Sequence, residues 1–423
     1  MNLKQNQFNK FMEIIKFVWE NSHSDFYRQK FQKANIDPFK DIKSLNDIQK
    51  IPFTTRKELA ERDPLTNIFG IESEISHIAT TSGTSFGDIA FFFHPYNEQL
   101  TILPQNIKKL LILAPVQRII PFIKTSWENK IVPILGDIRN LPSAAFLVKR
   151  LKIDAIYTDP ILLYFFEKYL TNFRAKIFIK TICLGSDALS ENKKKVFNRQ
   201  FPNAKILMGY GMSEFCRIGF QCENLAEKSS DTYHIRPDYV YYEIIDPKTN
   251  KGVSFGERGE LILSSLSNYV SPLIRYKTGD LAAFSKYKCN CGLGELLIQV
   301  FGRVNQDMVK VAGFVLNREQ FEDVILKLKS YLNGEFEIHI FEKDSSENYR
   351  PIKLVINLSL KQGVIDSSWL RNYVKETIIN FWRISPRLSL KKAVIDGLFS
   401  MPEIQFKKEG LPAPKKILIL HKI

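Results

Sequence analysis

The chain has 423 residues, of which 44% are hydrophobic and 25% are charged, and its formal net charge is +15. These values are typical of a soluble globular protein with two or three domains. No apolar run approaches the roughly 20 residues of a membrane-spanning helix, which argues against a membrane protein. The basic residues are spread along the chain, which favours lysines on solvated surfaces over a nucleic-acid-binding face.

The N-terminal sequence does not have the pattern of a signal peptide. Residues 1–7 lack the apolar core and the small-residue cleavage site that such a peptide needs. We therefore expect a cytoplasmic protein. Because the cytosol is reducing, the five cysteines are not expected to form structural disulfides.

The first part of the chain is predicted to be helical and polar. Four apolar residues fall on one helical face, namely Phe11, Ile14, Ile15 and Val18. Further along, Pro52 blocks a preceding helix, and Thr54 or Thr55 can cap a following one.

From residue 75 to about residue 272, short runs rich in Val and Ile alternate with amphipathic helical stretches. Residues 131–135, 155–157 and 181–184 are predicted strands, and residues 190–201, with an N-cap serine, are a predicted helix. Alternation of this kind predicts an α/β fold with a largely parallel sheet.

The pattern changes to β-rich between residues 239 and 263, where residues 246–252 read as a turn between two strands. A domain boundary is expected near Gly302-Arg303. We therefore predict a large N-terminal domain of α/β subdomains plus a β-rich part over residues 1–302.

Residues 303–423 are predicted to form a small α+β C-terminal domain. A helix begins near Asn317 with a capping-box pattern and continues through apolar residues at helical spacing. Residues 336–341 and 352–357 are predicted strands, and a helix follows from Ser367 to about Phe381.

Two pentapeptides share one inventory of side chains. Tyr210–Glu214 reads Tyr-Gly-Met-Ser-Glu, and Tyr276–Asp280 reads Tyr-Lys-Thr-Gly-Asp. Each combines an aromatic ring, a glycine, a hydroxyl and a carboxylate. These groups suit a nucleotide, because the ring can stack on a base and the glycine admits close backbone approach to phosphate. The hydroxyl can bond phosphate, and the carboxylate can bind a metal or ribose.

A stretch rich in hydroxyls and glycine lies upstream, at residues 80–88, after a short predicted strand. Its backbone N–H groups and side-chain donors can surround a triphosphate. A polar surface loop is the alternative interpretation of this stretch when it is considered alone.

In this order, and followed by Phe301-Gly302-Arg303, the motifs resemble those of the adenylate-forming enzymes, which activate carboxylic acids with ATP. Residues 26–31 and 51–59 resemble the short phenylacetate-CoA ligases and their capsule-biosynthesis-type relatives. The resemblance extends over roughly residues 26–418. It implies an adenylate-binding N-terminal domain and a C-terminal domain that acts as a mobile lid.

The resemblance implies roles for individual residues. Tyr210 stacks on adenine, Ser213 contacts the α-phosphate and Glu214 holds Mg²⁺, while Asp280 accepts the ribose hydroxyls. The other residues implied in nucleotide binding are Ser82, Gly83, Thr84, Ser85 and Gly87 of the phosphate loop, Gly185 and Asp187 of an upstream turn, Gly211, and Arg303.

The chain departs from the family's pattern in the phosphate loop and in the hinge. Phe86 is inserted before Gly87, and Asp88 stands in place of the usual lysine. Asn305 occupies the place of the hinge aspartate, and Asp307 follows two residues later. The pattern therefore does not assign the hinge residue, and it does not show how tightly the loop binds the β- and γ-phosphates.

Relatives also carry a lysine near the C-terminus that reaches the reacting carboxylate and the α-phosphate. The corresponding stretch here contains Lys415-Lys416-Ile417 without the usual glycines. Lys416 is the first candidate for the catalytic lysine and Lys415 the second. A basic C-terminal tail is the alternative interpretation.

Four residues have the side chains of a tetrahedral zinc site. Cys289 and Cys291 form a Cys-x-Cys knuckle, and Cys222 and His234 lie upstream. Small buried thiols are the alternative. Together the four residues resemble the structural zinc cluster of one branch of the family. The remaining two cysteines, Cys183 and Cys216, are expected to be core thiols.

The resemblance implies a two-step reaction on an organic carboxylic acid, with an aromatic acid favoured. ATP converts the acid into an acyl-adenylate, and coenzyme A then forms a thioester. Transfer to a carrier-protein thiol or an amine, and a non-catalytic nucleotide-binding homologue, are the alternatives. The implied cofactors are Mg²⁺ and structural Zn²⁺; no nucleic-acid or membrane partner is expected, and a homodimer is an option.

Overall fold

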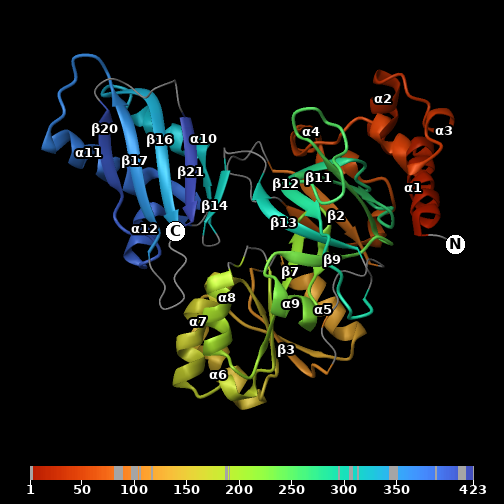
Figure 1. Ribbon diagram of the computed structural model, residues 1–423, viewed down its shortest axis with the longest axis horizontal. Coiled ribbons are helices and arrows are strands. Elements are labelled where there is room, and N and C mark those ends of the chain that lie inside the picture. The colour runs from red at the N-terminus through yellow and green to blue at the C-terminus, as the bar shows by residue number, and fades with distance from the viewer. Residues whose placement is uncertain are drawn as a thin grey trace. The chain divides into compact units, whose positions relative to one another are not determined.

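The computed structural model describes residues 3–80, 89–96, 103, 106–115, 118–185, 189, 191–293, 296–303, 308–311, 314–342, 351–385, 388–407 and 416–422. The chain divides into two compact units (Figure 1). One comprises Met1–Ser186 with Gln200–Val304, and the other comprises Asp187–Arg199 with Asn305–Ile423. Among the described residues, no helix combines the length and apolarity needed to cross a membrane. The mixed α/β architecture confirms the predicted fold class; the roles of adenylate binding and lid stay predictions.

Helices form the N-terminal region of the first unit: the long α1 (Leu3–Glu20), followed by the short α2 (Phe26–Lys33), α3 (Pro38–Asp41) and α4 (Arg56–Ala60), with 3₁₀ turns η1 (Leu45–Lys50), η2 (Pro64–Asn67) and η3 (Glu72–Glu74). The predicted apolar face of α1 is confirmed, because its four residues are fully buried. Thr55 caps α4 in a capping box with Glu58, as its position before that helix predicts.

An 11-stranded sheet forms the framework of the first unit, in the order β10-β11-β12-β13-β9-β8-β7-β6-β5-β3-β4. The parallel strands are β3 (Lys109–Ile112), β4 (Val132–Leu135), β5 (Ala155–Thr158), β6 (Thr181–Leu184) and the first half of β7 (Lys205–Met212). The antiparallel strands are β8 (Cys216–Phe220), β9 (Thr232–Ile235), β10 (Val240–Ile245), β11 (Gly259–Ser265), β12 (Tyr276–Phe284) and β13 (Leu297–Arg303). The predicted parallel and β-rich parts are thus two halves of one sheet.

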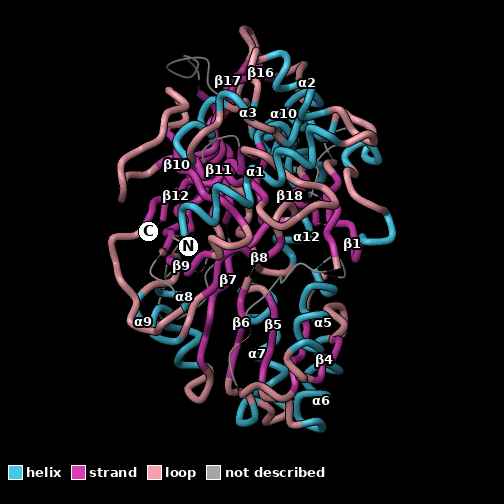
Figure 2. The backbone as a smooth tube through the Cα atoms, turned by 90° about the vertical axis from the view of Figure 1, so that its right-hand side faces the viewer, coloured by secondary structure: helices cyan, strands magenta, loops and turns pink. Residues whose placement is uncertain are grey.

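Helices cover both faces of the parallel half, as Figures 1 and 2 show. They are α5 (Ile119–Glu128), α6 (Leu141–Leu151), α7 (Pro160–Asn172) and α9 (Glu223–Lys228), with the 3₁₀ turn η6 (Lys176–Phe178). Helix α8 (Glu191–Gln200) follows β6 in the chain, and all of it but Gln200 is grouped with the second unit. The predicted strands at 131–135, 155–157 and 181–184 and the predicted helix at 190–201 are confirmed.

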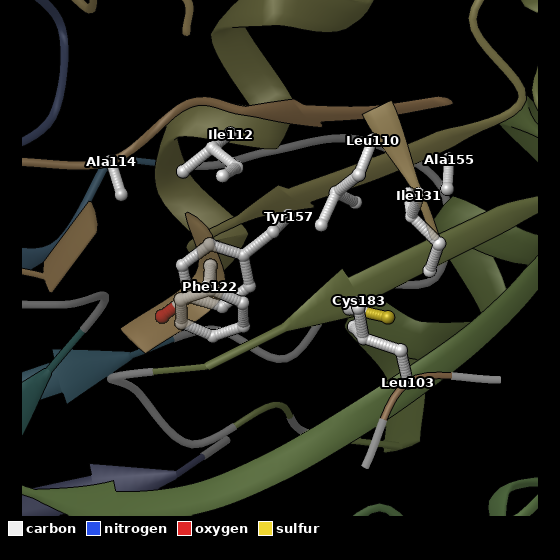
Figure 3. Packing of buried hydrophobic residues seen from close by; sticks show 9 residues of the cluster. All are labelled: Leu103, Leu110, Ile112, Ala114, Phe122, Ile131, Ala155, Tyr157 and Cys183. Atoms are coloured by element: carbon white, nitrogen blue, oxygen red, sulfur yellow. The ribbon is translucent and has the colours of Figure 1, made fainter. Parts of the chain in front are cut away.

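A core cluster lies between these helices and the parallel strands (Figure 3). Phe122 of α5 stacks on Tyr157 of β5 with ring centroids 3.4 Å apart. Cys183 of β6 is buried in the same cluster, which confirms that it is a core thiol. This core supports the ends of β5 and β6, where the chain continues toward Gly185.

The N-terminal region is joined to the chain that precedes β12. Thr54 pairs with Tyr276 as an isolated β-bridge, and its hydroxyl donates to the Ile274 carbonyl at 2.7 Å. The Tyr27 hydroxyl donates to the Pro272 carbonyl and accepts from the Ile274 N–H, each at 3.0 Å. These contacts hold the start of the second pentapeptide in place.

The second unit contains a β14 (Met308–Val311) and β15 (Phe314–Asn317) hairpin, helix α10 (Arg318–Lys327), and a four-stranded sheet in the order β20-β17-β16-β21. Its strands are β16 (Leu332–Glu342), β17 (Lys353–Leu360), β20 (Glu403–Lys407) and β21 (Lys416–Lys422), and the remaining elements are α11 (Ser368–Phe381), β18 (Arg383–Ser385), β19 (Leu388–Ser389) and α12 (Leu390–Ile395). The predicted α+β character is confirmed. Strands β20 and β21 are additions that the sequence patterns did not predict.

Candidate functional site

The first pentapeptide lies where β7 changes its partner. Up to Met208 the strand pairs in parallel with β6, and from Gly209 it pairs antiparallel with β8. The strand therefore extends to Met212, because β8 supplies new hydrogen-bond partners. Ser213 and Glu214 form the turn between the two strands. The junction of the parallel and antiparallel halves thus carries the hydroxyl and the carboxylate.

The second pentapeptide lies inside β12 and forms a bulge rather than a chain reversal. Ile262 of β11 is opposite Lys277, whereas Glu260 is opposite Leu281, so β12 carries extra residues between these pairs. Gly279 has a φ of +71°, a conformation that glycine adopts without steric cost. The Thr278 hydroxyl donates to the Leu261 carbonyl at 2.7 Å and accepts from the Asp280 N–H at 3.0 Å. The bulge fixes the backbone that carries Asp280.

Each pentapeptide holds the carboxylate of the other. The Tyr210 hydroxyl donates to Asp280 Oδ2 at 2.7 Å, and the Tyr276 hydroxyl donates to Glu214 Oε1 at 2.8 Å. Asp280 is 9% exposed and Tyr276 is 1% exposed. Hydrogen bonds to an ionised carboxylate are stronger than those between neutral groups, so both acids are oriented within the framework of the sheet.

A β-hairpin brackets the polar stretch that is predicted to bind phosphates. Strands β1 (Ile75–Thr80) and β2 (Phe91–Pro95) pair antiparallel, with Thr80 opposite Phe91. The Ser213 hydroxyl donates to the Thr80 carbonyl at 2.9 Å, so the hairpin is joined to the first pentapeptide. Ser82, Gly83, Thr84, Ser85 and Gly87 lie outside the described residues.

Gly185 packs against Tyr157 of β5, whereas Arg303 lies beside the second pentapeptide. A Cβ atom at Gly185 would lie 3.3 Å from the Tyr157 hydroxyl oxygen, so the glycine permits close packing there. Arg303 of β13 is paired with Asp280 of β12 in the sheet register. Asp187 lies outside the described residues.

The four predicted zinc ligands come together. Cys222 Sγ lies 3.5 Å from Cys289 Sγ, and Cys291 Sγ lies 3.3 Å from His234 Nε2. With zinc–sulfur and zinc–nitrogen bonds of about 2.3 and 2.0 Å, tetrahedral geometry separates ligand atoms by about 3.5 to 3.8 Å, which these distances approach. The Leu225 N–H donates to Cys222 Sγ at 3.3 Å. Burial raises the pKa of the Cys222 thiol to about 12.

Cys216 has surroundings that differ from the expectation of a core thiol. It is half-buried, and its Sγ lies 3.3 Å from His94 Nδ1. Its backbone is left-handed, with a φ of +51°. The expectation is wrong because Cys216 begins β8 directly after the turn that carries Ser213 and Glu214, where it faces the hairpin rather than the core.

Three curated relatives match most of the chain. They are phenylacetate-coenzyme A ligases from Thermus thermophilus, Pseudomonas putida and Escherichia coli, with identities of 23%, 22% and 22%. The alignments cover 77%, 82% and 77% of this chain and 76%, 80% and 76% of the relatives. No family model matches the sequence.

Over most of its length, the chain is similar in sequence to phenylacetate-coenzyme A ligases.

Two solved structures share the fold of this chain. A 2-hydroxyisobutyryl-CoA ligase in complex with 2-HIB-AMP and CoA aligns with a TM-score of 0.72 at 17% identity, covering 99% of this chain and 90% of that protein. An amide bond synthetase from Marinactinospora thermotolerans aligns with a TM-score of 0.54 at 14% identity, covering 82% and 68%. At these identities the likeness establishes the fold alone.

The second unit contains the candidate lysine. Lys416 is the first residue of β21, where it is paired with Phe336 of β16. Residues 416–422 thus form the edge strand β21 of the four-stranded sheet, and the catalytic role of Lys416 stays a prediction. Lys415 lies outside the described residues.

Proposed function

We propose that this enzyme activates an organic carboxylic acid, of which an aromatic acid is the favoured class, as its adenylate and then transfers the acyl group to coenzyme A. The observation that supports this most is the reciprocal bonding of Tyr210 to Asp280 and of Tyr276 to Glu214. It joins two motifs that are 62 to 70 residues apart in the chain into one constellation. The phenylacetate-coenzyme A ligases named above support the choice of reaction.

In this proposal, each of the neighbouring side chains binds a different part of ATP. The Tyr210 ring stacks on adenine, Asp280 accepts the ribose hydroxyls, and Ser213 donates to the α-phosphate in exchange for its bond to the Thr80 carbonyl. Mg²⁺ is commonly held by one carboxylate together with substrate phosphates, so the single carboxylate of Glu214 fits this ion. Bound there, the ion would neutralise charge on the phosphates.

The reaction proceeds in two displacements. A carboxylate oxygen of the acid attacks the α-phosphorus, and the bond from this phosphorus to the bridging oxygen breaks, so that pyrophosphate leaves. The Lys416 ammonium stabilises charge on the phosphorus oxygens and orients the carboxylate. The sulfur of coenzyme A, having lost its proton, then attacks the acyl carbon, and AMP leaves.

We also infer that Cys222, His234, Cys289 and Cys291 hold a structural Zn²⁺. The donor set of three thiols and one imidazole matches closed structural zinc sites. These residues come from β9, from the N-cap of α9 and from the segment after β12, so the ion would tie three parts of the antiparallel half together.

Carboxylate-dependent exchange of labelled pyrophosphate into ATP tests the proposed function. We expect exchange with at least one member of a panel of aromatic and aliphatic acids, and AMP formation that depends on coenzyme A with the same acid. Glu214→Gln and Asp280→Ala should each abolish exchange. Asp137→Asn is the matched control and should leave it unchanged, because this carboxylate is paired with Arg139 on an exposed loop.

Each other outcome points to a different reading. Exchange without consumption of coenzyme A would redirect the second step to a carrier-protein thiol or an amine. No exchange with any acid, by protein that still binds ATP, would overturn the proposal in favour of a non-catalytic homologue. Exchange restricted to aliphatic acids would remove only the aromatic preference.

A further inference from the structure

A second cluster of metal-binding side chains lies apart from the four cysteine and histidine residues described above. It consists of His77 in β1, His94 in β2 and Cys216 at the start of β8, and their potential ligand atoms all lie within 4.8 Å of one another. His94 is fully buried and His77 is 8% exposed. The two imidazoles face each other across the hairpin, with ring centroids 4.7 Å apart.

The hydrogen-bond network assigns a tautomer to each histidine. His94 Nε2 lies 2.9 Å from the Ser213 carbonyl, which can only accept, so Nε2 carries the proton. The Ser76 hydroxyl donates to the His94 carbonyl at 2.9 Å and therefore accepts from His77 Nδ1, also at 2.9 Å. In the neutral rings, the unprotonated nitrogens are thus His94 Nδ1 and His77 Nε2.

These two unprotonated nitrogens lie near the same sulfur. Cys216 Sγ is 3.3 Å from His94 Nδ1, 3.6 Å from His94 Nε2 and 3.9 Å from His77 Nε2. The sulfur therefore lies over the face of the His94 ring, and a small rotation of this ring would direct its Nδ1 lone pair to a shared cation. A tetrahedral zinc ion separates its sulfur and nitrogen ligands by about 3.6 Å, which falls between the distances from the sulfur to the two unprotonated nitrogens.

Each histidine also forms, through its other ring nitrogen, the kind of hydrogen bond that metal-binding histidines form. A ligating histidine commonly donates its other N–H to a carbonyl or another oxygen, which fixes the ring and its tautomer. The Ser213 carbonyl and the Ser76 hydroxyl have this role here. Two imidazoles with one thiolate suit Zn²⁺, and sites with three protein ligands leave a fourth position for water.

We propose that His77, His94 and Cys216 form a second site for a divalent cation of the zinc type. The site would join the hairpin that brackets the predicted phosphate loop to the turn that carries Ser213 and Glu214. The bonds from Ser213 to Thr80 and from His94 to Ser213 already connect these two parts. The cation would add a stronger connection between them.

Zinc analysis of the purified full-length chain after extensive dialysis tests the proposal. We expect about two zinc ions per chain in the wild type and about one each in Cys216→Gly and Cys289→Ser. Glycine suits the left-handed backbone of Cys216, so this variant removes the sulfur without straining the turn. His77→Gln provides a second disruption of the same site, and the exposed His23→Gln is the matched histidine control.

Cobalt substitution identifies which site is lost. The four-residue cluster supplies three thiolates and the proposed site supplies one, so Cys216→Gly should remove about a quarter of the thiolate-to-cobalt absorption. Cys289→Ser should remove most of the remainder. Circular dichroism melting confirms that each variant is folded.

The result that would overturn the proposal is unchanged zinc content in both Cys216→Gly and His77→Gln. If Cys289→Ser then loses all zinc, the four-residue site stands alone. If Cys289→Ser keeps its zinc while Cys216→Gly and His77→Gln lose it, the new site holds and the four-residue site fails.

Discussion

At the residue scale, the two tyrosine hydroxyls distinguish this site from a pair of independent motifs. A tyrosine in such a motif is expected to act through its ring, yet both hydroxyls here donate to carboxylates. Tyr276 is buried against Phe92 and Phe215, with ring centroids 6.2 and 6.1 Å away, so its hydroxyl has little freedom to turn elsewhere. We therefore assign Tyr276 a positioning role toward Glu214.

Replacement of Tyr276 by phenylalanine should lower kcat/KM for ATP by about ten- to a hundredfold. This range corresponds to the roughly 1.5 to 3 kcal/mol of a hydrogen bond to a charged group. Steady-state kinetics with varied ATP and varied Mg²⁺ measure the effect, and the Mg²⁺ concentration for half-maximal rate should rise.

Tyr287→Phe is the matched control, since it removes a tyrosine hydroxyl that lies outside both pentapeptides. Unchanged ATP and Mg²⁺ dependence in Tyr276→Phe would contradict the positioning role of Tyr276.

At the element scale, a buried ion pair holds the chain that leads into the second pentapeptide. The Arg275 guanidinium donates to both carboxylate oxygens of Glu243 in β10, at 3.1 and 3.0 Å. It also donates to the carbonyls of Gln49 and Ile51. Arg275 is 2% exposed. One side chain therefore connects the N-terminal region, β10 and the start of β12.

Arg275→Met should lower the free energy of unfolding by about 3 to 5 kcal/mol, because it leaves the Glu243 carboxylate buried without its partner. Urea denaturation followed by circular dichroism measures the change. The double variant Glu243→Leu/Arg275→Met should recover part of the loss, since no unpaired charge remains.

The exposed pair of Lys353 with Glu403 is the matched control for this ion pair. Lys353→Met should change the free energy of unfolding by less than about 1 kcal/mol, as solvent screens an exposed pair. Equal losses in Lys353→Met and Arg275→Met would contradict the assigned importance of the buried pair.

The four-residue zinc cluster is a second device at this scale. Cys289→Ser should lose zinc and lower the melting temperature, because the knuckle after β12 would no longer be tied to β9 and α9. Metal analysis and thermal melting with added chelator measure both effects. A variant that keeps near-stoichiometric zinc would contradict the assignment, and Cys183→Ser, which removes the buried thiol of β6, should keep the zinc.

At the scale of the whole molecule, the proposed chemistry needs groups from both compact units. The nucleotide motifs lie in the first unit, and Lys416 begins a strand of the second. A strand start is a well-defined place for a catalytic lysine, because the parallel pairing of β21 with β16 fixes the backbone. The net charge of +15 is consistent with the binding of polyanionic substrates. Because the lysines are spread along the chain, we expect most of them to lie on solvated surfaces.

Lys416→Ala should lower the rate of adenylation by at least about a hundredfold while ATP binding and thermal stability stay close to those of the wild type. Pyrophosphate exchange measures the first and calorimetric titration the second. Lys415→Ala is the matched control next to it. If Lys415→Ala loses exchange and Lys416→Ala keeps it, the register of the C-terminal stretch is wrong.

The predictions from sequence succeeded where signals were local. Helical periodicity located α1, the pair of candidate capping threonines located α4, and apolar runs located β4, β5 and β6, because each depends on neighbours in the chain. The extension of β7 to Met212 and the existence of β20 and β21 were missed. A strand's end depends on whether a partner continues beside it, and the partners of these strands are distant in sequence.

By itself, the sequence determined the chemical inventory of this protein: two carboxylate-bearing pentapeptides, a hydroxyl-rich stretch, four zinc-type ligands and the resemblance of these motifs to those of the adenylate-forming enzymes. The tertiary structure alone decided which groups meet. In the structure, the tyrosine of each pentapeptide bonds the carboxylate of the other pentapeptide. Cys216, which was expected in the core, lies near His77 and His94 instead. The physical reason is that sheet pairing sets contacts between residues 60 to 140 positions apart in the chain, and no local pattern encodes such pairs.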